Sequence, residues 1–406
     1  MLETRTISSK ITFVMTLAVV SLFLLAIIFP GIYHNSFSDF PTRNSSGFEL
    51  GHQAYIVVAS NVLVFAFGYI YYKNKIPSIN HKIEQIRNFE ISRKITVIIL
   101  IVIISLYAGF SAPELLLDES EQWGDYHVLL DSLELWPDGT PPPDEPYIEE
   151  QLDRYVRMAL LYSSIEIFQN IKVLPFIASI LVVLFTFVLT VQFTGKRFAG
   201  IISMLVLLQS HLFLTFDTIA VYENFWVLFF MISLYAVRKK WIFSPIFYIL
   251  SVFTKAYVAP FFLMTLYSTY RSEIKKREKY LIFASYVAII LIAIGIVFAG
   301  KSIYVDVVDI EPSKFFLGFA DTSMQFRYDI LFTMMILPVT IGLYLLSKNM
   351  HNTDTIHSLI LGTLVFSPIL ITFTYFYDIL PYRHIPTIVF FAIGIGFFFA
   401  KKHLSK

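Results

Sequence analysis

Long apolar runs recur along the whole chain, and they constrain its fold more than any other feature. A helix needs about 20 mostly apolar residues to cross the hydrocarbon core of a membrane. The sequence therefore predicts an all-α polytopic membrane protein of about twelve transmembrane helices. We place these spans at 11–30, 53–72, 95–112, 173–193, 198–215, 221–237, 241–254, 257–270, 280–299, 328–346, 356–375 and 384–400.

The composition agrees with a membrane protein. Apolar residues make up 56% of the chain and charged residues 15%, whereas soluble domains average roughly 45–50% and about 25%. The formal net charge of +1 argues against nucleic acid as a partner. The chain has no cysteine, which excludes disulfides, thiol catalysis and thiolate metal sites.

Two regions allow more than one interpretation. The run 11–30 follows two basic residues, as in a signal peptide, but no small-residue cleavage pattern comes after it, so we expect an uncleaved first helix. The region 241–270 carries Lys255 near its middle and is either two short helices or one long broken helix. We expect two, because the charge pattern needs an even number of crossings there.

The charge pattern predicts the orientation in the membrane, since cytoplasmic loops are enriched in Lys and Arg. Twelve spans place both termini on one side. With that side in the cytoplasm, cytoplasmic segments hold 22 of the 31 Lys and Arg but only 6 of the 30 Asp and Glu. We expect residues 1–94 to form a two-helix segment with a basic cytoplasmic loop, and 95–406 to form the main membrane module.

Two predicted outer loops are long, 111–172 and 301–327. The first is strongly acidic and contains a proline-rich stretch that forbids regular helix. Within it, the stretch 147–168 carries apolar residues at roughly helical spacing, which predicts an amphipathic helix lying in the membrane interface.

Acidic residues follow the third predicted span within a few positions. They are Asp118, Glu119, Glu121 and Asp125, and His127 comes just after them. A functional site here would use one acid as a general base, and the others would bind a metal or orient an acceptor. The alternative is a solvated acidic loop that only ends a span.

Further charged residues fall on the same predicted side. Asp217 and Glu223 lie at the outer start of the sixth span, Lys255 lies between the seventh and eighth, and Arg383 and His384 lie at the outer start of the last. Each has a structural alternative: a helix-start acid favoured by the macrodipole, a snorkelling lysine, or a salt bridge from Arg383 to Asp378. Together, outer acids and a few outer bases suit a phosphorylated substrate, with bases holding the phosphate and an acid deprotonating a hydroxyl.

These residues, in this order, resemble the GT-C superfamily of glycosyltransferases, close to its protein mannosyltransferase and aminoarabinose transferase branch. The acidic pair Asp118-Glu119 directly follows a predicted span, and 170–237 is similar to the family's central block. The stretch LSVFTKAYVAPFF supplies a lysine after an apolar helix at Lys255, and LPYRHIPTIVFF supplies the late arginine at Arg383.

The resemblance implies an inverting transferase that takes a sugar from a polyprenyl or dolichyl phosphate. Asp118, with Glu119, would be catalytic, and Lys255, Arg383 and His384 would bind the donor phosphate. Glu121, Asp125, His127, Asp217 and Glu223 would orient the acceptor or hold a divalent cation. The acceptor would be a protein, a lipid or a glycan.

An outward-facing site agrees with this donor, because nucleotide sugars are cytoplasmic and a lipid must bring the sugar across. Two other functions stay open. One is a transporter or flippase of a lipid-linked or anionic solute, for which mid-membrane charges and inverted repeats would be expected. The other is a non-catalytic subunit of a glycosylation complex.

Overall fold

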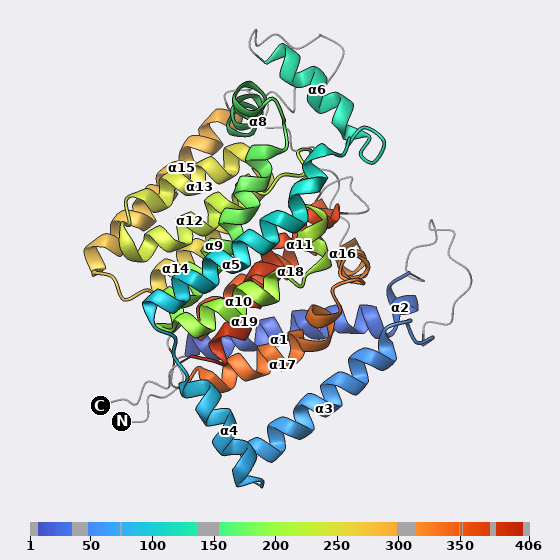
Figure 1. Ribbon diagram of the computed structural model, residues 1–406, viewed down its shortest axis with the longest axis vertical. Coiled ribbons are helices and arrows are strands. Elements are labelled where there is room, and N and C mark those ends of the chain that lie inside the picture. The colour runs from blue at the N-terminus through green and yellow to red at the C-terminus, as the bar shows by residue number, and fades with distance from the viewer. Residues whose placement is uncertain are drawn as a thin grey trace. The chain divides into compact units, whose positions relative to one another are not determined.

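The structure, a computed structural model, describes residues 7–34, 48–73, 75–136, 154–298, 314–348, 350, 352–373 and 379–400. Every regular element within these residues is a helix: 18 α-helices and three short 3-10 helices (Figure 1). The predicted all-α fold is confirmed. The proline-rich stretch of the first outer loop and Asp378 lie outside the described residues.

Five helices are long and apolar enough to cross a membrane, and they indicate an integral membrane protein. They are α1 (Ile7–Ile28), α3 (Ala54–Tyr72), α5 (Arg93–Ser111) continued by η1 (Ala112–Leu116), α9 (Val173–Thr194) and α18 (Thr353–Phe373). Each coincides with one of the predicted spans.

The other predicted spans also contain helices, several of them short. These are α10 (Arg197–Leu207), α11 (His211–Thr215), α12 (Phe225–Lys239), α13 (Phe243–Thr254), α14 (Phe262–Arg271), α15 (Lys276–Phe298), α17 (Ile330–Leu346) and α19 (Ile385–Phe397). The number of spans, twelve, therefore stays a prediction. The expected fifth span is interrupted, because a turn at 208–210 separates α10 from α11.

The helical structure is interrupted at Lys255, as the sequence suggested. Helix α13 ends at Thr254, Lys255 has extended backbone angles of φ −147° and ψ 110°, and η2 (Ala256–Phe261) leads into α14. The remaining elements are α2 (Pro30–His34), α4 (Pro77–Asn88), α6 (Asp125–Leu135), α8 (Tyr155–Phe168), α16 (Lys314–Gln325) and η3 (Pro381–His384). Helix α8 falls within the stretch predicted to be an amphipathic helix.

The helices form two compact units. Unit 1 comprises Met1–Arg93, Thr190–Leu212 and Val305–Lys406, and unit 2 comprises Lys94–Leu189 and Phe213–Tyr304. The expected division into 1–94 and 95–406 concerned membrane segments and stays a prediction.

Unit 1 is built on close helix packing. Helix α18 packs against α1, α16 and α19, and α10 packs against α19. Small residues allow the closest contacts: a Cβ on Gly318 of α16 would lie 2.4 Å from the Cα of Pro368 in α18. Glycine at this position therefore sets how near the two backbones come.

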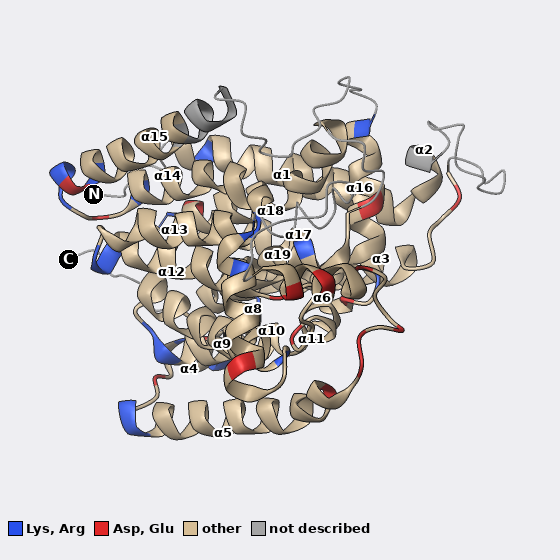
Figure 2. Ribbon diagram, turned by 90° about the horizontal axis from the view of Figure 1, so that it is seen from above, with Lys and Arg blue, Asp and Glu red and all other residues tan. Residues whose placement is uncertain are grey.

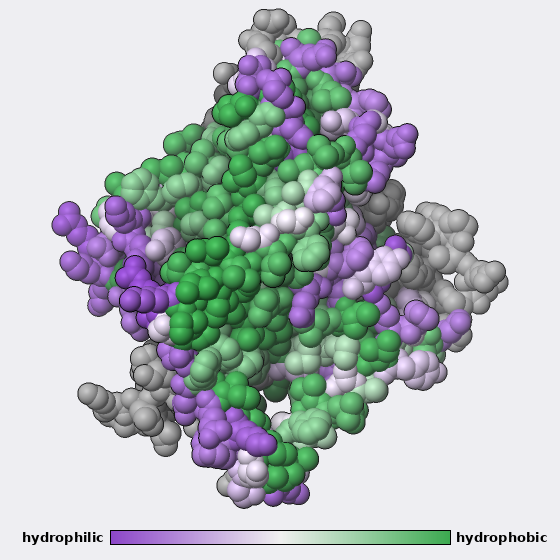
Figure 3. Space-filling view, in the orientation of Figure 1, coloured by the Kyte–Doolittle hydropathy of each residue, from purple (hydrophilic) through white to green (hydrophobic). Residues whose placement is uncertain are grey.

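Unit 2 separates its charges along its helices. Helices α12 and α13 pack side by side, and α13 also packs against α8. Figure 2 shows Lys and Arg at the start of α5 and where α12 ends, and Asp and Glu around α6 and beyond the other end of α5. Between these ends the surface of α5 is hydrophobic (Figure 3): Ile98, Ile101 and Val102 are 50–61% exposed. A lipid-facing helix has such a surface.

Replacing Gly318 by alanine should destabilise the protein, because the added methyl group meets backbone atoms that cannot move aside. Overpacking of this kind costs about 1–3 kcal/mol. We expect a lower melting temperature for the detergent-solubilised Gly318→Ala variant. Gly68→Ala in α3 is the matched control, since a Cβ there meets nothing within 4 Å. Equal melting temperatures for the two variants would contradict the packing described here.

Candidate functional site

Several of the predicted site residues come together in unit 2. The segment from η1 through the loop 117–124 contacts the segment 216–224, which connects α11 to α12. Lys255, at the break between α13 and η2, joins them through Glu223. The residues concerned are thus far apart in sequence and are held in place by specific polar contacts.

Glu119 connects the two segments. Its side chain is 1% exposed, and its Oε1 and Oε2 accept hydrogen bonds from the backbone N–H groups of Ala220 (2.8 Å) and Val221 (3.2 Å). Burial raises the pKa of Glu119, although these N–H groups and Lys172 oppose the shift. A carboxylate bound in this way fixes the loop that begins at Leu117.

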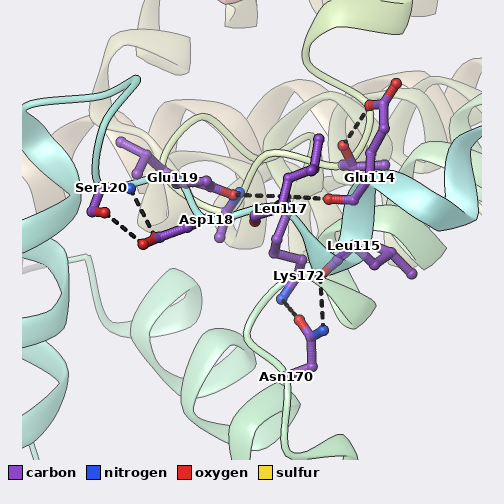
Figure 4. Close-up of polar contacts among 11 residues, drawn as sticks. Glu114, Leu115, Leu117, Asp118, Glu119, Ser120, Asn170 and Lys172 are labelled. Carbon is purple, nitrogen blue, oxygen red and sulfur yellow. Dashed lines mark hydrogen bonds and ion pairs between the residues drawn. The ribbon is translucent and has the colours of Figure 1, made fainter.

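Lys172 supports the same loop from below Glu119 (Figure 4). Its ammonium donates to the carbonyl oxygens of Glu114 (2.6 Å) and Leu117 (3.1 Å) and lies 3.7 Å from Glu119 Oε1. Asn170 adds a hydrogen bond from its amide to the Leu115 carbonyl at 3.0 Å. The end of η1 is therefore tied to the start of α9.

Asp118, next to Glu119, is exposed. Its two oxygens accept hydrogen bonds from the backbone N–H (3.0 Å) and the hydroxyl (2.6 Å) of Ser120 (Figure 4). The hydroxyl and then the N–H of Ser120 lower the pKa of Asp118. Asp118 is thus an accessible, ionised carboxylate on a loop that its neighbour holds in place.

Glu223 is the centre of a buried ion cluster. Its Oε2 accepts a hydrogen bond from Arg157 Nε at 2.9 Å and lies 3.7 Å from Lys255 Nζ. Glu223, Arg157 and Lys255 are all 2% exposed or less. Arg157 also donates to the Val221 carbonyl at 2.8 Å. The other oxygen, Oε1, is buried and accepts no hydrogen bond from any residue that the structure describes.

Asp217 occupies a separate buried position at the end of α5. Its Oδ2 accepts a hydrogen bond from the Ser111 hydroxyl at 2.8 Å, and the next residue, Thr218, donates to Glu114 Oε2 at 3.1 Å. Burial raises the pKa of Asp217 to about 7. Asp217 therefore titrates near neutral pH.

The other acidic-loop residues lie at the surface. Asp125 is exposed at the start of α6 and accepts a hydrogen bond from the Tyr222 hydroxyl at 3.1 Å. Trp123 packs edge-on against the Tyr222 ring, with centroids 4.9 Å apart. Glu121 and His127 are exposed. Their proposed part in orienting an acceptor stays a prediction.

The two late residues belong to unit 1. Arg383 lies in η3, where its Nε donates to the Tyr382 hydroxyl at 3.2 Å. His384 is completely buried, its ring centroid is 5.3 Å from that of Phe326, and neither ring nitrogen has a hydrogen-bond partner among the described residues. Their approach to Lys255 stays a prediction, and so does a phosphate site built from all three.

The described carboxylates are not grouped as metal ligands. In the parts of the chain that the structure describes, no three His, Asp or Glu side chains converge as ligands. Glu119 already accepts two backbone hydrogen bonds, and Glu223 faces two cations. These donors do not suit a divalent cation, which takes several free carboxylate or carbonyl oxygens.

Sequence reasoning did not single out Arg157 or Lys172. Both lie in segments predicted to be outside the cytoplasm, where only 9 of the 31 Lys and Arg occur. Their rarity there was the available signal. A buried base on the acidic side needs a carboxylate partner, and Glu223 and Glu119 are those partners.

No protein-family model, no curated protein and no solved structure matches this chain.

The pKa of Asp217 predicts a pH dependence of stability. Folding raises this pKa from about 3.9 in an unfolded chain to about 7. The fold thus binds the proton more tightly, and the stabilisation is complete below about pH 4 and lost as the pH rises through about 7. Asp217→Asn cannot ionise, and its amide oxygen still accepts from Ser111. Its melting temperature should fall less than that of the wild type between about pH 5.5 and 8.5.

Asp118→Asn is the control for this measurement, because Asp118 is exposed and its pKa is lowered. The pH dependence of this variant should equal that of the wild type. An Asp217→Asn variant with the same pH dependence as the wild type would show that Asp217 is ionised throughout this range.

Proposed function

We propose that this chain is a membrane glycosyltransferase of the GT-C kind. It moves a sugar from a polyprenyl or dolichyl phosphate to an acceptor hydroxyl on the extracytoplasmic face, with inversion at the anomeric carbon. One observation carries the proposal. Glu119 ties the accessible carboxylate Asp118 to the segment that bears Glu223, where two buried cations already meet.

Asp118 has the properties of a general base. It is exposed, so an acceptor can reach it, and its lowered pKa keeps it ionised at neutral pH. The Ser120 bonds hold its oxygens in a fixed direction. In our assignment Asp118 takes the proton, and Glu119 positions the loop without touching the substrate.

Lys255 and Arg157 have the properties of a phosphate site. Both are cations held in place by one carboxylate, so a phosphate meets charges that are already ordered and largely shielded from water. Oε1 of Glu223, which is buried and has no hydrogen-bond partner among the described residues, would accept a hydrogen bond from a sugar or acceptor hydroxyl.

The reaction then balances without a cofactor. The acceptor oxygen attacks the anomeric carbon on the face opposite the lipid phosphate, and its proton passes to Asp118. The bond from the anomeric carbon to the phosphate oxygen breaks, and the lipid phosphate leaves with the electron pair, stabilised by the cations. A single displacement of this kind inverts the configuration.

The distribution of charge in unit 2 supports the orientation. Basic residues lie at one end of α5 and α12, and the candidate site lies beyond the other end of α5 (Figure 2). Under the positive-inside rule the site faces away from the cytoplasm, and both termini are cytoplasmic. A lipid-linked donor is the kind available on that face.

Asp118→Asn should abolish transfer while leaving expression and membrane insertion normal. Losing a general base lowers turnover by about 10²–10⁴-fold. The measurement is incorporation of label from polyprenyl-phosphate-linked monosaccharides into acceptors of membranes that contain the protein. Glu134→Gln, an exposed acid on α6, is the matched control and should keep full activity. Undiminished transfer by Asp118→Asn would exclude the role assigned here, and donor uptake without transfer by the wild type would favour a flippase.

The orientation can be tested separately, because the chain has no cysteine of its own. Glu134 on α6 and Gln85 on α4 are both exposed. In intact cells, Glu134→Cys should react with a membrane-impermeant thiol reagent, and Gln85→Cys should react only after the membrane is permeabilised. The reverse pattern would place the candidate site in the cytoplasm.

A further inference from the structure

Helix α4, in unit 1, carries an apolar stripe that no other element among the described residues covers. Ile79, Ile83 and Ile86 are 37–50% exposed, and no residue of the helix is buried. At about 100° per residue, these three side chains fall within about 60° of one another around the helix. The stripe is therefore continuous and open along the whole of α4.

Basic side chains border this stripe on both sides. Lys82 and Arg87 each lie about 70° from its middle, in opposite directions. The far side of the helix is polar: His81 and Gln85 hydrogen-bond to each other at 2.9 Å, and Asn88 and Glu84 lie beside His81 around the helix. Cations at the border between an apolar and a polar face are typical of helices that lie in a membrane interface.

The surrounding segment is basic as well. Residues 73–94 contain six Lys or Arg and two Glu, a formal charge of +4 in a chain whose total is +1. This segment lies between α3 and α5, both of which are long and apolar enough to cross a membrane. The ends of α4 are thus joined by short connections to candidate spans, which keeps the helix near a membrane surface.

Polar contacts hold α4 at both ends and leave the stripe open. Asn80 donates to the carbonyl oxygen of Tyr71 at the end of α3 (3.2 Å), and Lys196 donates to the carbonyl oxygen of Arg87. Just after the helix, Arg197 pairs with Glu90 at 3.3 Å. The direction of the stripe is therefore set by unit 1 and not by free rotation of a loop.

We propose that α4 is a membrane-surface helix that binds anionic lipid. The isoleucine stripe enters the boundary between headgroups and acyl chains, and Lys82, Arg87 and the flanking bases bind lipid phosphates. The charge favours a lipid surface over a partner helix, because a partner would need a matching acidic surface, whereas an anionic leaflet supplies negative charge along the whole length of α4. This inference does not depend on the proposed transferase activity.

Spin labels on the full-length protein test the proposal. Ile83→Cys places one label on the stripe, and Gln85→Cys places one on the polar side of the same helix. In nanodiscs containing phosphatidylglycerol, the Ile83 label should be several-fold more accessible to oxygen than to a water-soluble nickel chelate, and the Gln85 label should show the opposite preference. Equal chelate accessibility at the two positions would overturn the proposal.

The lipid dependence provides the second measurement. In zwitterionic nanodiscs the preference of the Ile83 label for oxygen should fall, and the double change Lys82→Gln and Arg87→Gln should cause the same fall in phosphatidylglycerol. The matched control is Lys275→Gln with Lys276→Gln, basic residues of unit 2, which should leave the label unchanged. In nanodiscs with no other protein added, the Ile83 label could instead be shielded from both oxygen and the chelate. That result would indicate packing against protein, such as a second copy, and would also overturn the proposal.

Discussion

Burying a carboxylate fully costs desolvation free energy unless cations and hydrogen bonds replace its water. Glu223 is such a carboxylate in unit 2. Its cation partners are Arg157 from α8 and Lys255 from the break between α13 and η2. Three segments that are distant in sequence are thereby held together at one end of the unit. Loss of either cation would leave a buried charge with one partner fewer, so the arrangement of these segments depends on the cluster as a whole.

Glu119, in the loop after α5, is a second buried carboxylate with hydrogen-bond and cation partners. Its carboxylate accepts hydrogen bonds from the backbone of Ala220 and Val221, three and two residues before Glu223, and Lys172 lies beside it. Adjacent acids thus have opposite environments: Glu119 is buried and fully engaged, whereas Asp118 is exposed and ionised. The buried acid thus attaches the loop to the segment before α12, while the exposed acid stays accessible at the surface.

The sequence was sufficient for features that depend on local pattern. Apolar length located the five long helices, and Lys255 marked the break between α13 and η2. The sequence was insufficient for helix boundaries and side-chain partners that tertiary contacts determine. Apolar content continues through the turn at 208–210, so one span was expected where α10 and α11 are separate. Two partners were missed: Arg157 is 66 residues from Glu223 along the chain, and Lys172 is 53 residues from Glu119. No local signal in the sequence pairs residues that far apart.

The exceptions to the charge pattern are the informative residues. Most Lys and Arg fall in the predicted cytoplasmic segments, and the isoleucine stripe and basic borders of α4 lie in one of these segments. Arg157, Lys172 and Lys255 are at the acidic end of unit 2 instead, and each is buried against a carboxylate. Water does not stabilise the charges of these three buried cations, so their carboxylate partners must. Glu119 has both oxygens engaged beside Lys172, whereas Glu223 keeps Oε1 open beside its two cations. The cluster at Glu223 therefore combines two buried cations with a buried carboxylate oxygen that has no hydrogen-bond partner among the described residues.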